Sequence, residues 1–244
     1  CSLACPVKIN TGDLVRKIRS QKRGPFSKLL AQWVARHYGI VIGLTRCVTR
    51  WMIQKVNAVN RFSSKTHSEP SKTIVYFESC PTRLFRAEEI KKQLVYILGL
   101  LDTRIIFISK KSLCCGLSLE NKGFPDAAKQ QTHTLEKVLL EASENGKNPV
   151  LCDTGSCIAQ FNPNSGLKII DVVDFFSQNL DKLPVKQQEK TVMLHIPCGT
   201  KRLGLTDKMR KIAGACATQV VIPQGIECCG FAGDKGFSLP ALNQ

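Results

Sequence analysis

The sequence predicts an α/β fold with mostly parallel sheets, and three of its features support this class. Short apolar runs rich in β-branched residues are too short for helices and lack polar alternation, so they are predicted to be strands buried on both faces. Helical stretches separate these runs, and strands that alternate with helices form βαβ units. The third feature is that the pattern occurs twice. The predicted strands are 73–79, 105–108, 148–151, 191–197 and 220–223, and two of the helices between them are 87–101 and 206–216.

The duplication is clearest in a Cys-Cys-Gly triplet. Cys114-Cys115-Gly116 recurs as Cys228-Cys229-Gly230, and a lone cysteine precedes each triplet at a similar distance, Cys80 in the first half and Cys198 in the second. Each lone cysteine ends an apolar run, and a second apolar run lies shortly before each triplet. An internal repeat indicates that a structural unit occurs more than once, so the sequence predicts two related lobes.

The cysteines are predicted to be metal ligands, because ligands of parallel sheets collect at the carboxyl ends of the strands. Cys152 and Cys157 follow another predicted strand and complete the first set. Five thiols suffice for an unusual iron–sulfur cluster or for a four-thiolate zinc site. The predicted metal ligands are Cys80, Cys114, Cys115, Cys152 and Cys157 in the first lobe, and Cys198, Cys228 and Cys229 in the second.

A plainer interpretation exists for each cysteine alone, since a free cysteine is most often a small buried hydrophobic residue. That interpretation would have to hold jointly for two spaced duplicates, which argues against it. Cys47 and Cys216 lie outside the pattern and are predicted to be core residues. His195 is a minor candidate ligand, because a histidine in a strand more often has a structural role.

The N-terminal stretch carries a second type of cysteine motif. Cys1 and Cys5-Pro6 have the C-x3-C-P spacing that ends a ferredoxin-type run of cluster ligands. In two-cluster ferredoxins the last cysteine ligates the other cluster, so Cys1 and Cys5 would serve different clusters. The missing partners are expected upstream, and we expect the chain to be cut at both ends.

Three segments follow from these patterns. Residues 1–70 are predicted to form the end of a ferredoxin-type iron–sulfur region and a basic helical segment, with a helix over about 13–20 and a long one over 26–62 after Gly24-Pro25. The first cysteine-rich lobe is predicted at 71–184, with a helix over 171–180. The second, truncated lobe is predicted at 185–244, and a loop over 183–190 is predicted at the junction of the two lobes.

Charge and cysteine usage limit the partners and the compartment. The net charge is +16, and residues 1–71 carry thirteen Lys or Arg against only Asp13 and Glu69. Such a segment attracts phosphates, but no nucleic-acid-binding module accompanies it and aromatic residues are sparse, so no nucleic acid is expected. A solvated face and contact with anionic lipid both remain open. The stretch 33–53 is apolar, but its arginines argue against a membrane span.

The motifs together resemble a known family. Cys1-x3-Cys5-Pro-Val-Lys-Ile-Asn-Thr-Gly-Asp, the two Cys-Cys-Gly elements and Cys228-Cys-Gly-Phe-Ala-Gly-Asp-Lys-Gly-Phe237 look like the C-terminal iron–sulfur part of bacterial FAD-linked, cytochrome-type D-lactate dehydrogenases. The wider Cys-Cys-Gly (CCG) superfamily includes iron–sulfur subunits of heterodisulfide reductase, of glycolate oxidase and of anaerobic glycerol-3-phosphate dehydrogenase. The motif after Cys228 favours the D-lactate enzyme among these.

The resemblance implies an oxidoreductase in which FAD on an upstream domain takes a hydride from a 2-hydroxy acid. Electrons would leave through [4Fe-4S] clusters toward quinone or cytochrome, and the CCG thiols would hold a non-cubane cluster or zinc. No catalytic residue is expected in this part of the enzyme. Clustered thiols favour a reducing cytoplasmic location, with peripheral contact to the inner face of the membrane. The alternatives are a separate iron–sulfur subunit of one of the related enzymes and, from another class, a zinc-stabilised basic binding module.

Overall fold

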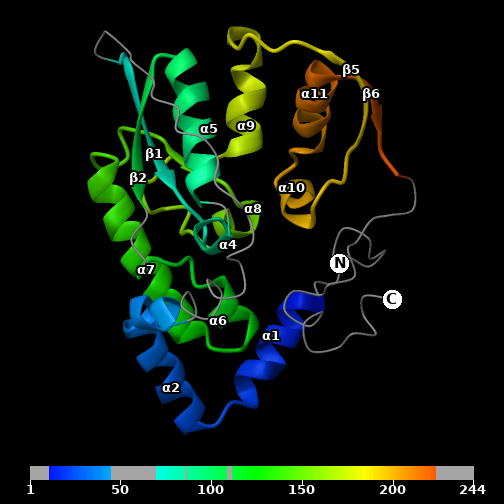
Figure 1. Cartoon of the computed structure of the whole chain (residues 1–244). Helices are drawn as coiled ribbons and strands as arrows, with labels where there is room; N and C mark the ends of the chain where they lie inside the picture. Colours follow the sequence, from blue (N-terminus) through cyan, green and yellow to red (C-terminus); the bar gives the residue numbers. More distant parts are fainter. Residues whose placement is uncertain (1–10, 45–69, 86, 109–111, 224–244) are drawn as a thin grey trace.

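The computed structural model describes residues 11–44, 70–85, 87–108 and 112–223 (Figure 1). Its main sheet has the strand order β2-β1-β3-β4, and every neighbouring pair is parallel. The α/β class with parallel strands is therefore confirmed. The strands are β1 (Lys72–Phe77), β2 (Thr103–Ile108), β3 (Val150–Cys152) and β4 (Ile169–Asp171).

Helices cover both faces of this sheet. Successive residues of a strand point to opposite faces, so neighbouring residues of β1 pack against different helices. Ile74 and Tyr76 of β1 pack on one face against α5 (Ala87–Leu100) and α9 (Val172–Gln178). Val75 and Phe77 pack on the other face against α7 (Pro125–Ala142). The run of buried residues without polar alternation in β1 is thus explained by helices on both sides, as the sequence predicted.

The remaining helices of the first lobe are short and lie near the ends of the strands. They are α4 (Cys80–Phe85), α6 (Leu117–Asn121), α8 (Gly155–Ile158) and the 3-10 turn Leu180–Lys182. The helix expected over 171–180 begins one residue later. Asp171 is its N-cap and accepts a hydrogen bond of 2.8 Å from the Val173 N–H, which satisfies a free donor of the first turn.

The second lobe is described only to residue 223. It contains β5 (Gln188–Met193) and β6 (Ala217–Val221), which pair in parallel, and the helices α10 (Cys198–Arg202) and α11 (Thr206–Cys216). Figure 1 shows α10 and α11 beside α8 and α9 of the first lobe. Lys208 Nζ of α11 lies 2.5 Å from Asp174 Oδ1 of α9, and this ion pair joins the two lobes.

Two expectations for the second lobe are wrong. The strand predicted over 191–197 lies earlier, at 188–193, and all six residues of β5 are exposed, whereas Leu194 and Ile196 of the predicted run are buried beyond its end. The reason is that, among the described residues, β5 pairs with β6 but no helix packs extensively against its faces, while α11 packs on β6. Cys216 was expected in the core, but it is exposed at the last turn of α11.

The N-terminal segment forms two helices, α1 (Thr11–Gln21) and α2 (Pro25–Arg36), with Gly24-Pro25 between them as expected. The long helix predicted over 26–62 is wrong at His37. This residue leaves the helical conformation with φ −105° and ψ 26°, while its N–H still bonds to the Trp33 carbonyl. Residues 38–44 are again helical, so the segment changes direction after α2 instead of continuing as one rod.

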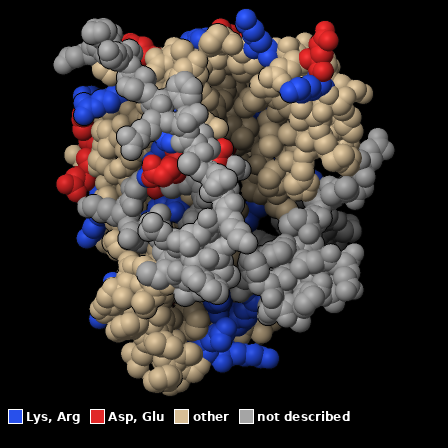
Figure 2. All heavy atoms as spheres, viewed as in Figure 1, with Lys and Arg blue, Asp and Glu red and all other residues tan. Residues whose placement is uncertain are grey.

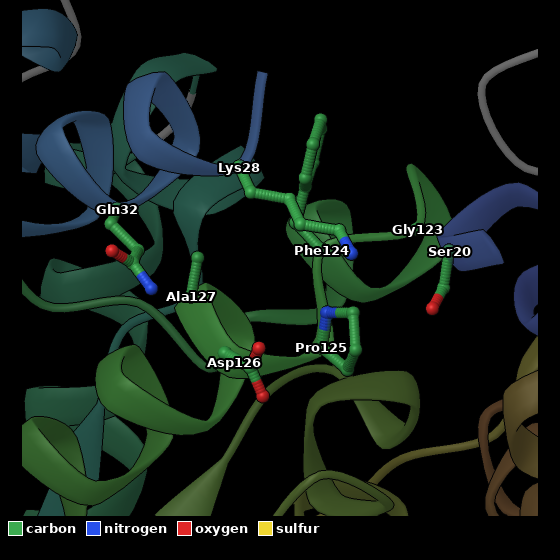
Figure 3. Close-up of a pocket in the computed structure, with 8 residues that line it drawn as sticks. All are labelled: Ser20, Lys28, Gln32, Gly123, Phe124, Pro125, Asp126 and Ala127. Atoms are coloured by element: carbon green, nitrogen blue, oxygen red, sulfur yellow. The ribbon is translucent and has the colours of Figure 1, made fainter. Parts of the chain in front are cut away.

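This hairpin of α1 and α2 is anchored on the first lobe. Arg19 Nη1 donates to the Asn121 carbonyl at 2.5 Å, and Arg23 Nε donates to the Lys122 carbonyl at 3.1 Å. The Arg23 guanidinium lies 5.0 Å from the centre of the Phe124 ring, a cation–π contact. Figure 3 shows the small pocket at this junction, which is lined by Ser20 of α1, Lys28 and Gln32 of α2, and residues 123–127 at the start of α7.

Candidate metal centre

The five first-lobe thiols follow three neighbouring strands. Cys80 begins α4 after β1, Cys114 and Cys115 lie between β2 and α6, Cys152 ends β3 and Cys157 lies in α8. Because β2, β1 and β3 are adjacent and parallel, their carboxyl ends meet at the same edge of the sheet. The topology therefore brings together cysteines that lie far apart in the sequence.

The thiols approach one another in pairs. Cys80 Sγ lies 3.5 Å from Cys114 Sγ, and Cys115 Sγ lies 3.1 Å from Cys157 Sγ. Cys152 packs in the same core cluster as Cys115 and Cys157, and its Sγ lies 3.6 Å from the Thr154 carbonyl oxygen. Cys80 is half-buried and the other four thiols are buried. All five are free.

The neighbouring thiols and burial raise the pKa of four of these cysteines in the metal-free chain. The Cys114 thiol and then burial raise the pKa of Cys80, and the Cys115 thiol and burial raise the pKa of Cys114. For Cys115, the Cys114 thiol lowers the pKa, but Cys157 and burial outweigh it and raise the pKa to about 12. The Cys115 thiol lowers the pKa of Cys157, but the Cys152 thiol and burial outweigh this effect, so the pKa of Cys157 is also raised. These four thiols are therefore protonated near neutral pH in the metal-free chain, and a metal must displace their protons.

Thiol alkylation at pH 8 tests this description of the metal-free chain. The nucleophile is the thiolate, so Cys115 and Cys157 are expected to react with iodoacetamide at least roughly tenfold more slowly than the exposed Cys198 and Cys216. The rates would be read from the masses of proteolytic peptides, with the denatured chain as the reference. Equal rates for buried and exposed cysteines in the folded chain would show that the described burial is wrong.

The donor set fits an iron–sulfur cluster better than a single ion. Tetrahedral ligation with bonds of about 2.3 Å places two sulfurs about 3.8 Å apart, close to the separation of Cys80 and Cys114. Among the described residues, however, no three His, Cys, Asp or Glu side chains converge on one metal position. Soft thiolates in separate pairs suit a cluster in which different irons take different ligands.

The second-lobe cysteines are described only in part. Cys198 begins α10 and is exposed, and so is His195. The residue after Cys198 reaches the first lobe, because a Cβ at Gly199 would lie 3.2 Å from Ser156 Oγ and 3.3 Å from Ser156 N in α8. The lobes thus touch through backbone beside Cys157. The predicted ligands Cys1, Cys5, Cys228 and Cys229, and the predicted core residue Cys47, lie outside the described residues.

Three residues around the thiols were missed by the sequence analysis. Thr132 Oγ1 of α7 donates to the Cys115 carbonyl at 2.8 Å and holds the Cys-Cys-Gly turn against that helix. Arg83 and Tyr38 both contact Cys80 Sγ, at 3.3 and 3.5 Å. Arg83 could have been found, because it lies three residues after Cys80 at helical spacing. Nothing in the sequence singles out Tyr38, because it lies 42 residues before Cys80 and outside the cysteine motifs.

A parallel α/β lobe with clustered cysteines at the carboxyl ends of its strands defines a cysteine-rich class of α/β protein. The chain matches the model of the cysteine-rich domain family, CCG, over residues 74–162 and 192–240, which is more than half of its length. The chain therefore belongs to the CCG cysteine-rich domain family. The two matched stretches correspond to the two halves of the duplication.

The chain is also similar to the C subunit of the anaerobic glycerol-3-phosphate dehydrogenase of Escherichia coli, from strain K12 and from O157:H7. Each is 27% identical over 182 residues, which cover 67% of this chain and 44% of the relative. The chain thus spans less than half the length of these curated relatives. These relatives are named as one subunit of a dehydrogenase, and the D-lactate specificity expected from the resemblance stays a prediction. No solved structure shows significant similarity to the chain.

Proposed function

We propose that this chain is the iron–sulfur electron-transfer part of a flavin-linked dehydrogenase. The observation that carries the proposal is the gathering of five free thiols at one edge of the parallel sheet, four of them buried and two pairs within 3.1–3.5 Å. Membership of the CCG family and similarity to one of the subunits of a dehydrogenase support it. A cluster bound there would accept and release single electrons.

In this proposal the protein holds the cluster and controls its surroundings. Cys80, Cys114, Cys115, Cys152 and Cys157 would supply the ligands of the first lobe. The apolar side chains packed around them, including Leu113 and Phe161, would keep water from the buried sulfurs. Cys1 and Cys5 would belong to ferredoxin-type [4Fe-4S] clusters, and Cys198, Cys228 and Cys229 to a second-lobe site, which completes a route for electrons from FAD toward quinone or cytochrome.

Two substrates have specific support. The motif of residues 228–237 resembles the D-lactate dehydrogenases, and we propose D-lactate on this ground. The similarity to the glycerol-3-phosphate dehydrogenase makes glycerol 3-phosphate the second candidate. In either case the substrate and FAD would bind to another domain or subunit, since the thiol site provides no group that takes up a hydride.

Substrate-dependent reduction tests the proposal. The full-length protein with its partners would be purified anaerobically, mixed with D-lactate or with glycerol 3-phosphate, and followed by EPR. We expect D-lactate to reduce the clusters before an added quinone reoxidises them. If only glycerol 3-phosphate reduces the clusters, it is the substrate instead of D-lactate, and the electron-transfer role stands. Iron–sulfur signals that respond to neither substrate nor quinone would contradict the role itself.

The α1–α2 hairpin has the character of a surface that lies on anionic lipid, and we propose peripheral membrane contact there. Phe26, Leu29, Leu30 and Trp33 form a stripe along α2 at helical spacing, and each is between 52% and 80% exposed. Figure 2 shows Lys and Arg side chains gathered at the lower end of the molecule, over α1. An exposed apolar stripe beside basic side chains is typical of helices at a bilayer surface. Within the described ranges, no helix is long and apolar enough to cross a membrane.

Removing charge from this surface is expected to weaken binding to anionic vesicles. Lys17 of α1 and Lys22, the residue after this helix, are exposed, and each basic residue near such a surface contributes about 1 kcal/mol. The double variant Lys17→Gln/Lys22→Gln should therefore bind phosphatidylserine vesicles about thirtyfold more weakly in a sedimentation assay at low salt. The exposed Lys186, in the loop before β5, provides the control Lys186→Gln. If the double variant binds vesicles as the wild type does, the hairpin serves another partner, such as the flavin-bearing subunit.

A further inference from the structure

Cys80 differs from the other first-lobe thiols in its surroundings. It is the only half-buried member of the five, and its Sγ is contacted by a cation and a hydroxyl besides the Cys114 thiol. Arg83 Nη2 lies 3.3 Å from Cys80 Sγ, and Tyr38 Oη lies 3.5 Å from it. Hydrogen bonds to the sulfur of a ligand and nearby charge are two of the factors that set the potential of an iron–sulfur cluster.

Arg83 is built into the site. It is 9% exposed, although arginine is rarely buried without a specific role. The Nη2 atom that contacts Cys80 also donates to the carbonyl of Leu113, the residue before Cys114. One guanidinium thus joins the two segments that supply the Cys80–Cys114 pair, and it keeps its positive charge at any physiological pH.

Tyr38 reaches the same sulfur from the N-terminal segment. It lies in the helical residues 38–44 that follow α2, and Gln131 Nε2 of α7 donates to the Ala35 carbonyl one turn earlier. Its neighbour Gly39 packs tightly on the first lobe, since a Cβ there would lie 3.3 Å from Ser112 Cβ. A tyrosine hydroxyl has an ordinary pKa of about 10, so it carries its proton near neutral pH. A protonated hydroxyl can donate to a thiolate.

We propose that Arg83 and Tyr38 are positioning residues that donate hydrogen bonds to the Cys80 thiolate and raise the reduction potential of the first-lobe cluster. This inference rests on the proposed iron–sulfur function. Both donors stabilise negative charge on the ligand sulfur, and the reduced cluster carries one more electron than the oxidised one, so they favour the reduced form. Tyr38 would also make the potential depend on the docking of the N-terminal segment.

The test is an EPR-monitored redox titration of the full-length protein and three variants, with iron and acid-labile sulfide measured in each. Arg83→Gln should lower the ratio of reduced to oxidised cluster at a fixed potential about tenfold, which corresponds to about 59 mV for one electron. Tyr38→Phe removes a single oxygen and should lower that ratio roughly threefold. Tyr96→Phe is the matched control, because Tyr96 is 57% exposed on α5, and it should change nothing.

The possible results separate the two proposals. If the wild-type protein contains iron and sulfide but its potential is unchanged in Arg83→Gln and Tyr38→Phe, this inference is wrong and the electron-transfer function stands. If the wild type contains neither iron nor sulfide, the proposed function fails first. Should Arg83→Gln lose its cluster, Arg83→Lys retains the charge and Tyr38→Phe retains the fold. A potential equal to that of the wild type in Tyr38→Phe would then overturn the assignment.

Discussion

Replacing Cys115 with serine is expected to remove most of the iron from the first lobe and to abolish its EPR signal. Cys115 is 4% exposed, and its Sγ lies 3.1 Å from that of Cys157. Serine has nearly the same shape, so the fold should persist, but its hydroxyl is a poor ligand for iron where a soft thiolate is required. The measurement is iron per chain together with the EPR spectrum of the anaerobically purified full-length protein.

The matched control is Cys216→Ser. Cys216 is a free cysteine of the same chain, but it is exposed at the end of α11 and lies outside the duplicated pattern. Its replacement should leave iron content and spectrum unchanged. Equal iron in the two variants would mean that Cys115 is a structural core residue, and the assignment of the buried first-lobe thiols as ligands would have to be abandoned.

Gly116→Ala is expected to destabilise the first lobe by about 2–5 kcal/mol, the sum of two costs. Gly116 has φ +80°, a left-handed conformation that costs a residue with a Cβ about 1–2 kcal/mol. The added Cβ would also lie 2.5 Å from the Ala128 carbonyl oxygen in α7, and such overpacking costs about 1–3 kcal/mol. The free energy of unfolding would be measured by urea denaturation of the metal-free protein, so that metal loss does not enter the comparison.

Gly99→Ala serves as the control for this variant. Gly99 lies in α5 of the same lobe, its φ is not positive, and apart from its chain neighbours and the backbone of its own helix no atom lies within 4 Å of the position of the added Cβ. Alanine in a helix is favoured over glycine by about 0.5–1 kcal/mol, so this variant should be slightly more stable than the wild type. If both variants unfold at the wild-type urea concentration, the Cys-Cys-Gly turn does not have the tight geometry described.

The order of elements and the parallel sheet could be predicted from the sequence because the signals are local. The apolar run 74–77 has no polar alternation, and both of its faces are in fact covered. The exposure of β5 could not be predicted in this way, since the composition of an apolar run does not show whether helices cover the faces of the strand that it forms. The end of α2 at His37 was missed for a related reason. His37 itself is neither proline nor glycine, Gly39 follows it within residues that are again helical, and the packing of Ala31, Ala35 and Ala127 between α2 and α7 is a tertiary contact.

The thiols of the site could be predicted because the chain repeats its motif, and parallel strands bring their carboxyl ends together. The pairing of Cys80 with Cys114 and of Cys115 with Cys157 could not, because it depends on the adjacency of β1, β2 and β3. Tyr38 shows the limit most clearly. Its hydroxyl reaches Cys80 only because α2 docks on α7, where Gln131 donates to the Ala35 carbonyl. No periodicity in the sequence predicts that docking.

The central claim is that the clustered thiols hold an iron–sulfur cluster, and metal and acid-labile sulfide analysis tests it most directly. The full-length protein would be purified anaerobically, and EPR spectra would be recorded in its oxidised and reduced forms. The account predicts iron and sulfide in similar amounts and a signal that Cys115→Ser removes and Cys216→Ser retains. Zinc without sulfide would contradict it and would make the first lobe a structural thiolate module.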